Sequence, residues 1–342
     1  MKAFYLIKNG QSNEAFELRD LTLSDPKENE VMIETEAFGL NFADVTARLG
    51  YYRACPPLPT VIGYDVVGRI VKMGTNVNDL TIGQRVLALT RFGGYATHVN
   101  TNSHGVVPIS EDTDAGIATA LATQYATAYY ASDYCMTLQK GEHVLIQAAA
   151  GGVGTALVQM AKRKGCIVYG TAGSPEKLEY IRQQGVDFPI NYRETDFYEY
   201  IKEKRGEKSI DAIFDSIGGA SVKNGLKLLA PGGRLAMYGM AQVVGDSDKK
   251  NMLRVLKMLF RFGKYRPTKF FALSQSIIGV NMLQIGDHKP YILNTCMNEV
   301  YKLYLNNEIK PVVSRVFKAG QLAEAHDYLQ KRQSVGKVVV KW

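Results

Sequence analysis

The chain has 342 residues, of which 46% are hydrophobic and 22% are charged, a composition typical of folded globular proteins and unlike that of disordered chains. Its length suits two domains with separate cores, and its 41 basic and 33 acidic residues give a formal net charge of +8. No charged-then-apolar leader with a small-residue cleavage site is recognisable, so we expect a soluble, unsecreted, cytoplasmic protein.

The first 120 residues are rich in predicted strands. Short alternating segments occur at 32–37, 66–71 and 85–89, and turns rich in Gly, Pro, Asn and Asp separate them. An alanine- and threonine-rich segment over 115–132 has the composition of a helix. This pattern predicts a β-barrel-like domain that a helix connects to the next domain.

An apolar segment at 144–146 leads into Ala149–Gly154, and a helical pattern follows this glycine-rich turn. In such a turn, glycines let the backbone approach a pyrophosphate, whose charge then lies at the helix N-terminus. Small residues also occur where a helix packs close to a sheet, so the turn alone leaves a purely structural interpretation open. Further predicted strands at 166–172, 211–215 and 234–239 favour a Rossmann domain that binds a dinucleotide.

The residues after the predicted strand at 166–172 indicate which dinucleotide binds. NAD sites place an acidic residue about twenty positions after the glycines, and Ser174 takes that place here, as the N-cap before Pro175. Ser174 and Lys177 offer hydroxyl and ammonium donors to a 2′-phosphate, although Glu176 lies in the same turn. We therefore expect NADPH; the alternative is that Ser174 only caps the helix and Lys177 is only solvated.

A strongly basic segment follows the last strand of this domain. Eight basic and no acidic residues lie between residues 249 and 270, and the spacing of Lys250, Arg254, Lys257 and Arg261 puts these four on one helical face. Apolar residues on the remaining surface suit a helix on an anionic membrane. A packed helix with a solvated basic face and a lid over the active site are the alternatives, and no nucleic-acid fold signature accompanies the segment.

After about residue 275, the pattern predicts isolated strands, the last of them at 336–340. The chain therefore returns to its first domain. We expect the domain segments 1–123, 124–272 and 273–342, without internal repeats or low-complexity tracts.

The cysteines and histidines show no metal-binding spacing. The four cysteines lie far apart, at Cys55, Cys135, Cys166 and Cys296, and no Cys-x-x-Cys or His-x-x-x-His pair occurs. We predict neither a disulfide framework nor a metal site.

Six segments resemble, in the same order, the motifs of one family: 39–44, the proline-rich run that ends at Gly63, 149–154, 191–192, 215–219 and 336–338. This family is the zinc-free quinone oxidoreductases of the medium-chain dehydrogenase/reductase superfamily. Tyr238–Met240 with the basic insertion after it, and Asn307–Pro311, are most similar to the vesicle amine transport protein homologues.

The resemblance implies an α/β fold with a GroES-like β-rich catalytic domain, formed from both chain ends, and a Rossmann doubly wound parallel-sheet domain. It also implies NADPH as cofactor, a homodimer formed by sheet-edge pairing, and hydride transfer to a quinone or a conjugated carbonyl. Zinc-dependent relatives carry a Gly-His-Glu ligand segment where this chain has Gly63-Tyr64-Asp65, and they have a four-cysteine lobe that this sequence lacks. We therefore expect chemistry without zinc.

The resemblance also suggests functional residues. Asn41, Asp44 and Tyr52 are the candidate catalytic residues, and Thr46 stands where many quinone reductases have tyrosine. The expected cofactor contacts are Ala149, Gly151, Gly152, Val153, Gly154, Gly173, Ser174, Lys177, Tyr192, Tyr238, Gly239 and Lys337.

Structural interpretations of these candidates stay open, because Asn41 could cap a turn, Asp44 could begin a helix and Tyr192 could pack on the sheet edge. Another functional class also remains. The chain could be an NADPH-binding factor that associates with lipid or membrane and turns over little substrate.

Overall fold

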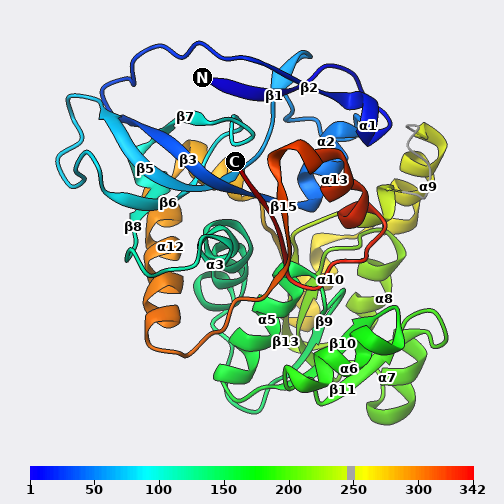
Figure 1. The fold of residues 1–342 in the computed structure, drawn as a ribbon. Helices are drawn as coiled ribbons and strands as arrows, with labels where there is room; N and C mark the ends of the chain where they lie inside the picture. The colour runs from blue at the N-terminus through cyan, green and yellow to red at the C-terminus, as the bar shows by residue number, and fades with distance from the viewer. Residues whose placement is uncertain (245–250) are drawn as a thin grey trace.

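The computed structural model describes residues 1–244 and 251–342, which form a mainly antiparallel sheet and a parallel sheet (Figure 1). The first has the strand order β15-β16-β3-β5-β6-β8, with β7 also paired to β3. Its strands are β3 (Glu30–Leu40), β5 (Asp65–Met73), β6 (Arg85–Leu89), β7 (His98–Asn102), β8 (Val106–Pro108), β15 (Val313–Lys318) and β16 (Lys337–Lys341). Because β16 pairs with β3, the two ends of the chain share one sheet.

A small sheet of order β2-β1-β4 completes the β-rich part, together with three short helices. These elements are β1 (Lys2–Leu6), β2 (Phe16–Asp20), β4 (Thr60–Val61), α1 (Ser12–Ala15), α2 (Phe42–Arg48) and η1 (Ser103–Gly105). Alternate apolar residues of the longer strands form a common buried core, which includes Val31, Ile33, Phe38, Leu40, Val66, Ile70, Val86, Val338 and Val340. Asn41 is the single residue between the end of β3 and the start of α2, so both elements fix its position.

The second sheet has six parallel strands in the order β11-β10-β9-β12-β13-β14. They are β9 (His143–Ile146), β10 (Ile167–Ala172), β11 (Phe188–Asn191), β12 (Ile210–Asp215), β13 (Leu229–Met237) and β14 (Ser276–Gly279). The helices that alternate with them are α5 (Gly152–Arg163), α6 (Pro175–Gln183), α7 (Phe197–Arg205) and α8 (Ala220–Leu228). This order is that of a Rossmann fold, in which ligands bind where the strand order reverses, here between β9 and β12. The predicted fold class is confirmed.

The last strand of this sheet lies beyond the predicted domain boundary at residue 272. β14 pairs in parallel with β13, from Arg234 opposite Ser276 to Met237 opposite Gly279. The boundary prediction was therefore too early, because the basic segment separates this strand from the rest of the sheet and hides its relation to them.

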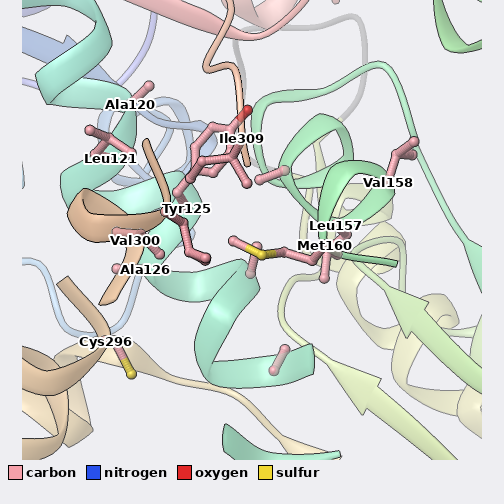
Figure 2. Close-up of a cluster of buried hydrophobic side chains, with 14 of the residues drawn as sticks. Ala120, Leu121, Tyr125, Ala126, Leu157, Val158, Met160, Cys296, Val300 and Ile309 are labelled. Atoms are coloured by element: carbon pink, nitrogen blue, oxygen red, sulfur yellow. The ribbon is translucent and has the colours of Figure 1, made fainter. Parts of the chain in front are cut away.

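A nearly continuous helical segment connects the two parts, as predicted. It comprises α3 (Ala115–Ala120), the π-helical turn η2 (Leu121–Tyr125), α4 (Ala126–Tyr129) and a second π-helical turn, η3 (Tyr130–Cys135). Figure 2 shows its buried side chains facing those of α5 and of residues 296–309. The alanines in this segment let the helices approach closely, so the connection is part of a shared core.

Helices dominate the chain after residue 280, where we expected isolated strands. They are α11 (Met282–His288), α12 (Pro290–Leu305), the short η5 (Ala319–Gln321) and α13 (Leu322–Gln330). The buried residues of α12 recur at helical spacing: Ile292, Leu293, Cys296, Met297, Val300 and Leu303. This periodicity was present in the sequence, so the expectation was wrong because the 3.6-residue period was overlooked.

The basic segment forms two helices beyond η4 (Ala241–Val243), namely α9 (Met252–Phe262) and α10 (Pro267–Leu273). Lys250, which we assigned to the basic face, and Lys249, which we counted in the basic segment, lie outside the described residues. Met258 anchors α9 in a small core, whereas Phe260 and Phe271 are 90% and 89% exposed. Within residues 1–244 and 251–342, no helix is long and apolar enough to cross a membrane.

Candidate functional site

The glycine turn lies at the reversal of strand order. Gly151 is the N-cap of α5, and no side chain of the described residues caps this helix N-terminus. A side chain at Gly154 would place its Cβ 2.2 Å from the Ala148 carbonyl oxygen, so only glycine permits this packing. The first N–H groups of α5 are thus arranged to bind an anion.

The neighbouring residues of the turn are packed against both domains. Ala149 is buried and its N–H donates to the Thr171 carbonyl, while Val153 is half-buried. Gly336 donates to the Ala150 carbonyl, which places the start of the C-terminal strand beside the turn.

Three predicted cofactor contacts gather at the ends of β10 and β11. Ser174 caps α6 by accepting from the Lys177 N–H, and the Tyr192 hydroxyl lies 2.3 Å from where a Cβ on Gly173 would stand. The missing side chain at Gly173 thus makes room for the Tyr192 ring. Glu176 is beside them, and a hydrogen bond with Ser174 lowers the pKa of Glu176.

The Lys177 ammonium turns away from this group. It donates to the carbonyl oxygens of Arg332 (2.6 Å) and Ser334 (2.9 Å), in the loop before β16. Burial, with the charges of Arg332 and Arg193, lowers the pKa of Lys177. The structure therefore brings Gly173, Ser174 and Tyr192 together, and it uses the side chain of Lys177 to hold the loop.

A buried ion pair lies behind Asn41. The Lys337 ammonium is 2.6 Å from Asp65 Oδ2 and donates to Asn41 Oδ1 at 2.9 Å, while Asn41 Nδ2 donates to Asp65 Oδ1. Thr123 also donates to this Asp65 oxygen, at 2.9 Å. Asp65 and Lys337 are completely buried, so each charge depends on the other.

Gly39 makes room for this pair. A Cβ at Gly39 would lie 2.0 Å from Asp65 Oδ2 and 2.1 Å from Lys337 Cε. The expected cofactor role of Lys337 remains a prediction, but its side chain is engaged in fixing Asn41. Sequence reasoning missed this role, although a lone charge at the start of each of two apolar strands was a visible signal.

Asp44 begins α2 and forms a capping box with Asn41. Its Oδ2 accepts from the Asn41 N–H at 2.7 Å, and its carboxyl group is completely buried. Burial raises the pKa of Asp44 to about 8, against the smaller opposing effect of this hydrogen bond. Asn41 and Asp44 thus have structural roles at the start of α2, and their catalytic roles remain predictions.

Tyr52 belongs to an aromatic cluster in the catalytic domain. Its ring centroid is 6.2 Å from that of Tyr64 and 6.5 Å from that of Phe92. Burial raises the pKa of the Tyr52 hydroxyl, and the charge of Asp44 contributes to the shift. The cluster forms an apolar wall close to Asp44.

Tyr238 and Gly239 directly follow β13. The Tyr238 N–H donates to the Asp215 carbonyl, and Gly239 packs against Ser216 so closely that a Cβ would lie 3.0 Å from the Ser216 oxygen. The buried Asp215 carboxylate accepts from the N–H groups of Ile217 and Gly218. The segment after β12 is therefore held in one conformation beside residues 238–239.

A basic cavity of about 670 Å³ opens between α9, η4 and the loop after α13. Six cationic residues line it: Arg193, Arg254, Lys257, Arg261, Lys331 and Arg332. Sequence reasoning singled out the three from α9 and missed the other three, which lie far from them in the sequence. Among the residues that the structure describes, no group of three or more His, Cys, Asp or Glu could hold a metal ion.

Comparison with known proteins identifies two domain families. The alcohol dehydrogenase GroES-like domain matches residues 27–127, and the zinc-binding dehydrogenase family matches residues 152–281. The human synaptic vesicle membrane protein VAT-1 homolog is 32% identical over 316 residues, which cover 92% of this chain and 79% of that protein.

Solved structures agree over the whole chain. Escherichia coli quinone oxidoreductase complexed with NADPH superposes with a TM-score of 0.85 and 26% identity, covering 100% of both chains. The CurK enoyl reductase superposes with a TM-score of 0.83 and 26% identity, covering 99% of both chains.

Proposed function

Because the chain belongs to the quinone oxidoreductase-like medium-chain dehydrogenase/reductases, we propose that it is an NADPH-dependent reductase of quinones or α,β-unsaturated carbonyls. The observation that carries this proposal is the uncapped glycine turn at the strand reversal, with the Asn41 network on the other domain beside it. The likeness to a quinone oxidoreductase and an enoyl reductase supports the acceptor class.

The residues present fit a phosphorylated dinucleotide. Gly152 and Gly154 let the turn and the start of α5 pack closely, because a Cβ at Gly152 would lie 2.0 Å from the Gln124 amide and one at Gly154 would lie 2.2 Å from the Ala148 carbonyl oxygen. The free N–H groups of α5 suit a pyrophosphate, and the Ser174 hydroxyl and Tyr192 suit the adenosine ribose and its 2′-phosphate.

When bound, NADPH supplies a hydride from its nicotinamide ring. One N–H of the Asn41 side-chain amide donates to Asp65, and the second N–H has no acceptor within the described part of the chain. Lys337 and Asp65 fix the amide so that this second N–H can stabilise the negative charge that develops on the acceptor oxygen. The protein thus orients the reactants and excludes water, and solvent supplies the proton.

The reaction proceeds without zinc in this proposal. At the segment where zinc-dependent relatives carry Gly-His-Glu, Tyr64 lies in the aromatic cluster and the Asp65 carboxylate is paired with Lys337. A carboxylate that is already neutralised by a buried ammonium is a poor ligand for an additional cation.

Steady-state kinetics test the proposal. The purified protein should oxidise NADPH saturably when given a panel of quinones and enones, and it should prefer NADPH to NADH. If NADPH binds but no acceptor in the panel is reduced, the reductase assignment fails while the cofactor assignment stands.

A second candidate function is contact with an anionic membrane surface. Leu256, Phe260 and Phe271 are exposed apolar side chains in the basic segment, a combination that favours lipid binding. Replacing Phe260 and Phe271 by serine should abolish sedimentation with phosphatidylserine vesicles while NADPH oxidation persists. Wild-type protein that does not sediment with such vesicles excludes this candidate.

A further inference from the structure

The basic cavity concentrates positive charge. Among residues 1–244 and 251–342, no acidic residue lines it, and five of its six cations make no ion pair with any of those residues. The exception is Lys331, whose ammonium is 3.5 Å from Asp327. Several unpaired cations around one hollow repel each other, so the cavity is arranged for an anion.

The cavity adjoins the adenosine end of the proposed cofactor site. Arg193 directly follows Tyr192, and the Arg332 carbonyl accepts from Lys177, which lies one turn into the helix that Ser174 caps. The expected contacts of the 2′-phosphate and the two cavity arginines therefore belong to one continuous region.

The cations of α9 lie on a different side of the helix from most of its exposed apolar residues. Arg254, Lys257 and Arg261 recur at positions i, i+3 and i+7, which puts them on one side of the helix, and all three line the cavity. Leu256, Leu259 and Phe260 are exposed and do not line it, whereas the exposed Leu253 does. Met258 and Val255 pack against the protein body and fix this orientation. The three cations therefore face a hollow in the protein, which favours a bound molecule over a membrane as their partner.

We propose that Arg254, Lys257 and Arg261 bind the phosphate groups of NADPH from this cavity, and that α9 thereby determines the preference for NADPH over NADH. This inference rests on the proposed function and adds α9 to its cofactor site. A 2′-phosphate carries about 1.5 to 2 negative charges near neutral pH, and arginine binds such a group through two parallel hydrogen bonds. NADH lacks this group and gains much less from the added cations.

The proposal also gives Lys177 a different part in selectivity. Because its ammonium holds the carbonyls of Arg332 and Ser334, Lys177 positions the loop that presents Arg332 to the cavity. Lys177 is thus a positioning residue, and the direct charge on the phosphate comes from the cavity arginines and α9.

The test is to measure the dissociation constants of NADPH, NADH and 2′,5′-ADP for wild-type protein and two triple variants. One variant carries Arg254→Gln, Lys257→Gln and Arg261→Gln. The matched control carries Lys264→Gln, Arg266→Gln and Lys269→Gln, which remove the same charge from the segment that does not line the cavity. Titration calorimetry at low salt provides all three constants without turnover.

In the α9 variant, we expect the dissociation constants of NADPH and 2′,5′-ADP to rise about tenfold or more and that of NADH to rise by less than about threefold. Added salt should reduce this difference. The control variant should resemble the wild type. Equal weakening of NADPH and NADH, or equal effects of the two variants, would overturn the proposal. So would unchanged NADPH binding with lost sedimentation on phosphatidylserine vesicles, which would assign the cations to a membrane. Wild-type protein that binds no dinucleotide overturns the proposed function itself.

Discussion

Asn41 has its amide held from two sides by opposite charges, and this explains why its orientation is fixed. Lys337 donates to its oxygen and Asp65 accepts from its nitrogen, so the reverse amide orientation would oppose donor to donor. The direction in which the second N–H points is therefore set by residues that do not need to touch substrate.

Replacing Asn41 by alanine should lower turnover about a hundredfold and leave NADPH affinity nearly unchanged, because an N–H that stabilises developing charge acts mainly in the transition state. Steady-state kinetics and NADPH titration measure the two effects. Thr123→Val is the matched control, since it also removes a hydrogen bond to Asp65 but leaves the amide in place. Unchanged turnover in the Asn41 variant would remove this residue from the catalytic set.

Asp44 should make the folded protein less stable as pH rises. Burial raises the pKa of Asp44 from 3.8 to about 8, so the folded state binds this proton more tightly than the unfolded state. The contribution to stability is therefore present below about pH 4 and is lost as pH rises toward about 8, with a slope of at most about 1.4 kcal/mol per pH unit.

Asp44→Asn should flatten this dependence, because the amide cannot ionise and its oxygen can still accept from the Asn41 N–H. Urea unfolding at several pH values between about 5 and 8 measures the slope. Identical slopes for the variant and the wild type would show that Asp44 does not hold the proton.

Among the elements, β16 is tied to β5 by the ion pair between Lys337 and Asp65, in addition to its hydrogen bonds with β3. Lys337→Met should destabilise the protein by about 3 to 5 kcal/mol, because it leaves a buried carboxylate without its partner. Lys341→Met removes the same charge from the exposed end of the same strand and should cost little. Denaturant unfolding compares them, and equal costs would argue against a special role for the pair.

Local sequence patterns predicted β9, β10, β12 and β13, because each of these parallel strands is a short apolar run. Ser174 and Pro175 begin α6 as expected. The same patterns located the glycine turn, whose spacing follows from the way a helix must pack on its strand.

Contacts between distant segments were beyond such reasoning. Asp65 and Lys337 meet only because both chain ends enter one sheet, and Arg193 meets Arg332 only through the fold. The sequence likewise could not show that the Lys177 ammonium is bound by two carbonyls. Charged side chains that act over long sequence separations therefore define much of the candidate site.

For the whole molecule, β14 leaves one edge of the parallel sheet without a partner among the described residues. Pairing of this edge with that of a second copy would give the homodimer that the resemblance implies. Ile277 on β14 is 40% exposed, and Ile277→Lys should shift a dimer toward the monomer in light scattering, because two lysines would meet across the edge. A wild-type monomer, or an unaffected dimer, contradicts this assembly.

Hydride transfer from NADPH at a site that needs no metal can be tested directly by isotope labelling. We would treat the protein with a chelator and supply an enone with NADPH deuterated on either face of C4 of the nicotinamide ring. We expect a reduced product with deuterium on its β-carbon from one of the two labelled cofactors and none from the other. A product without deuterium from both, or activity that returns only when zinc is added, would contradict it.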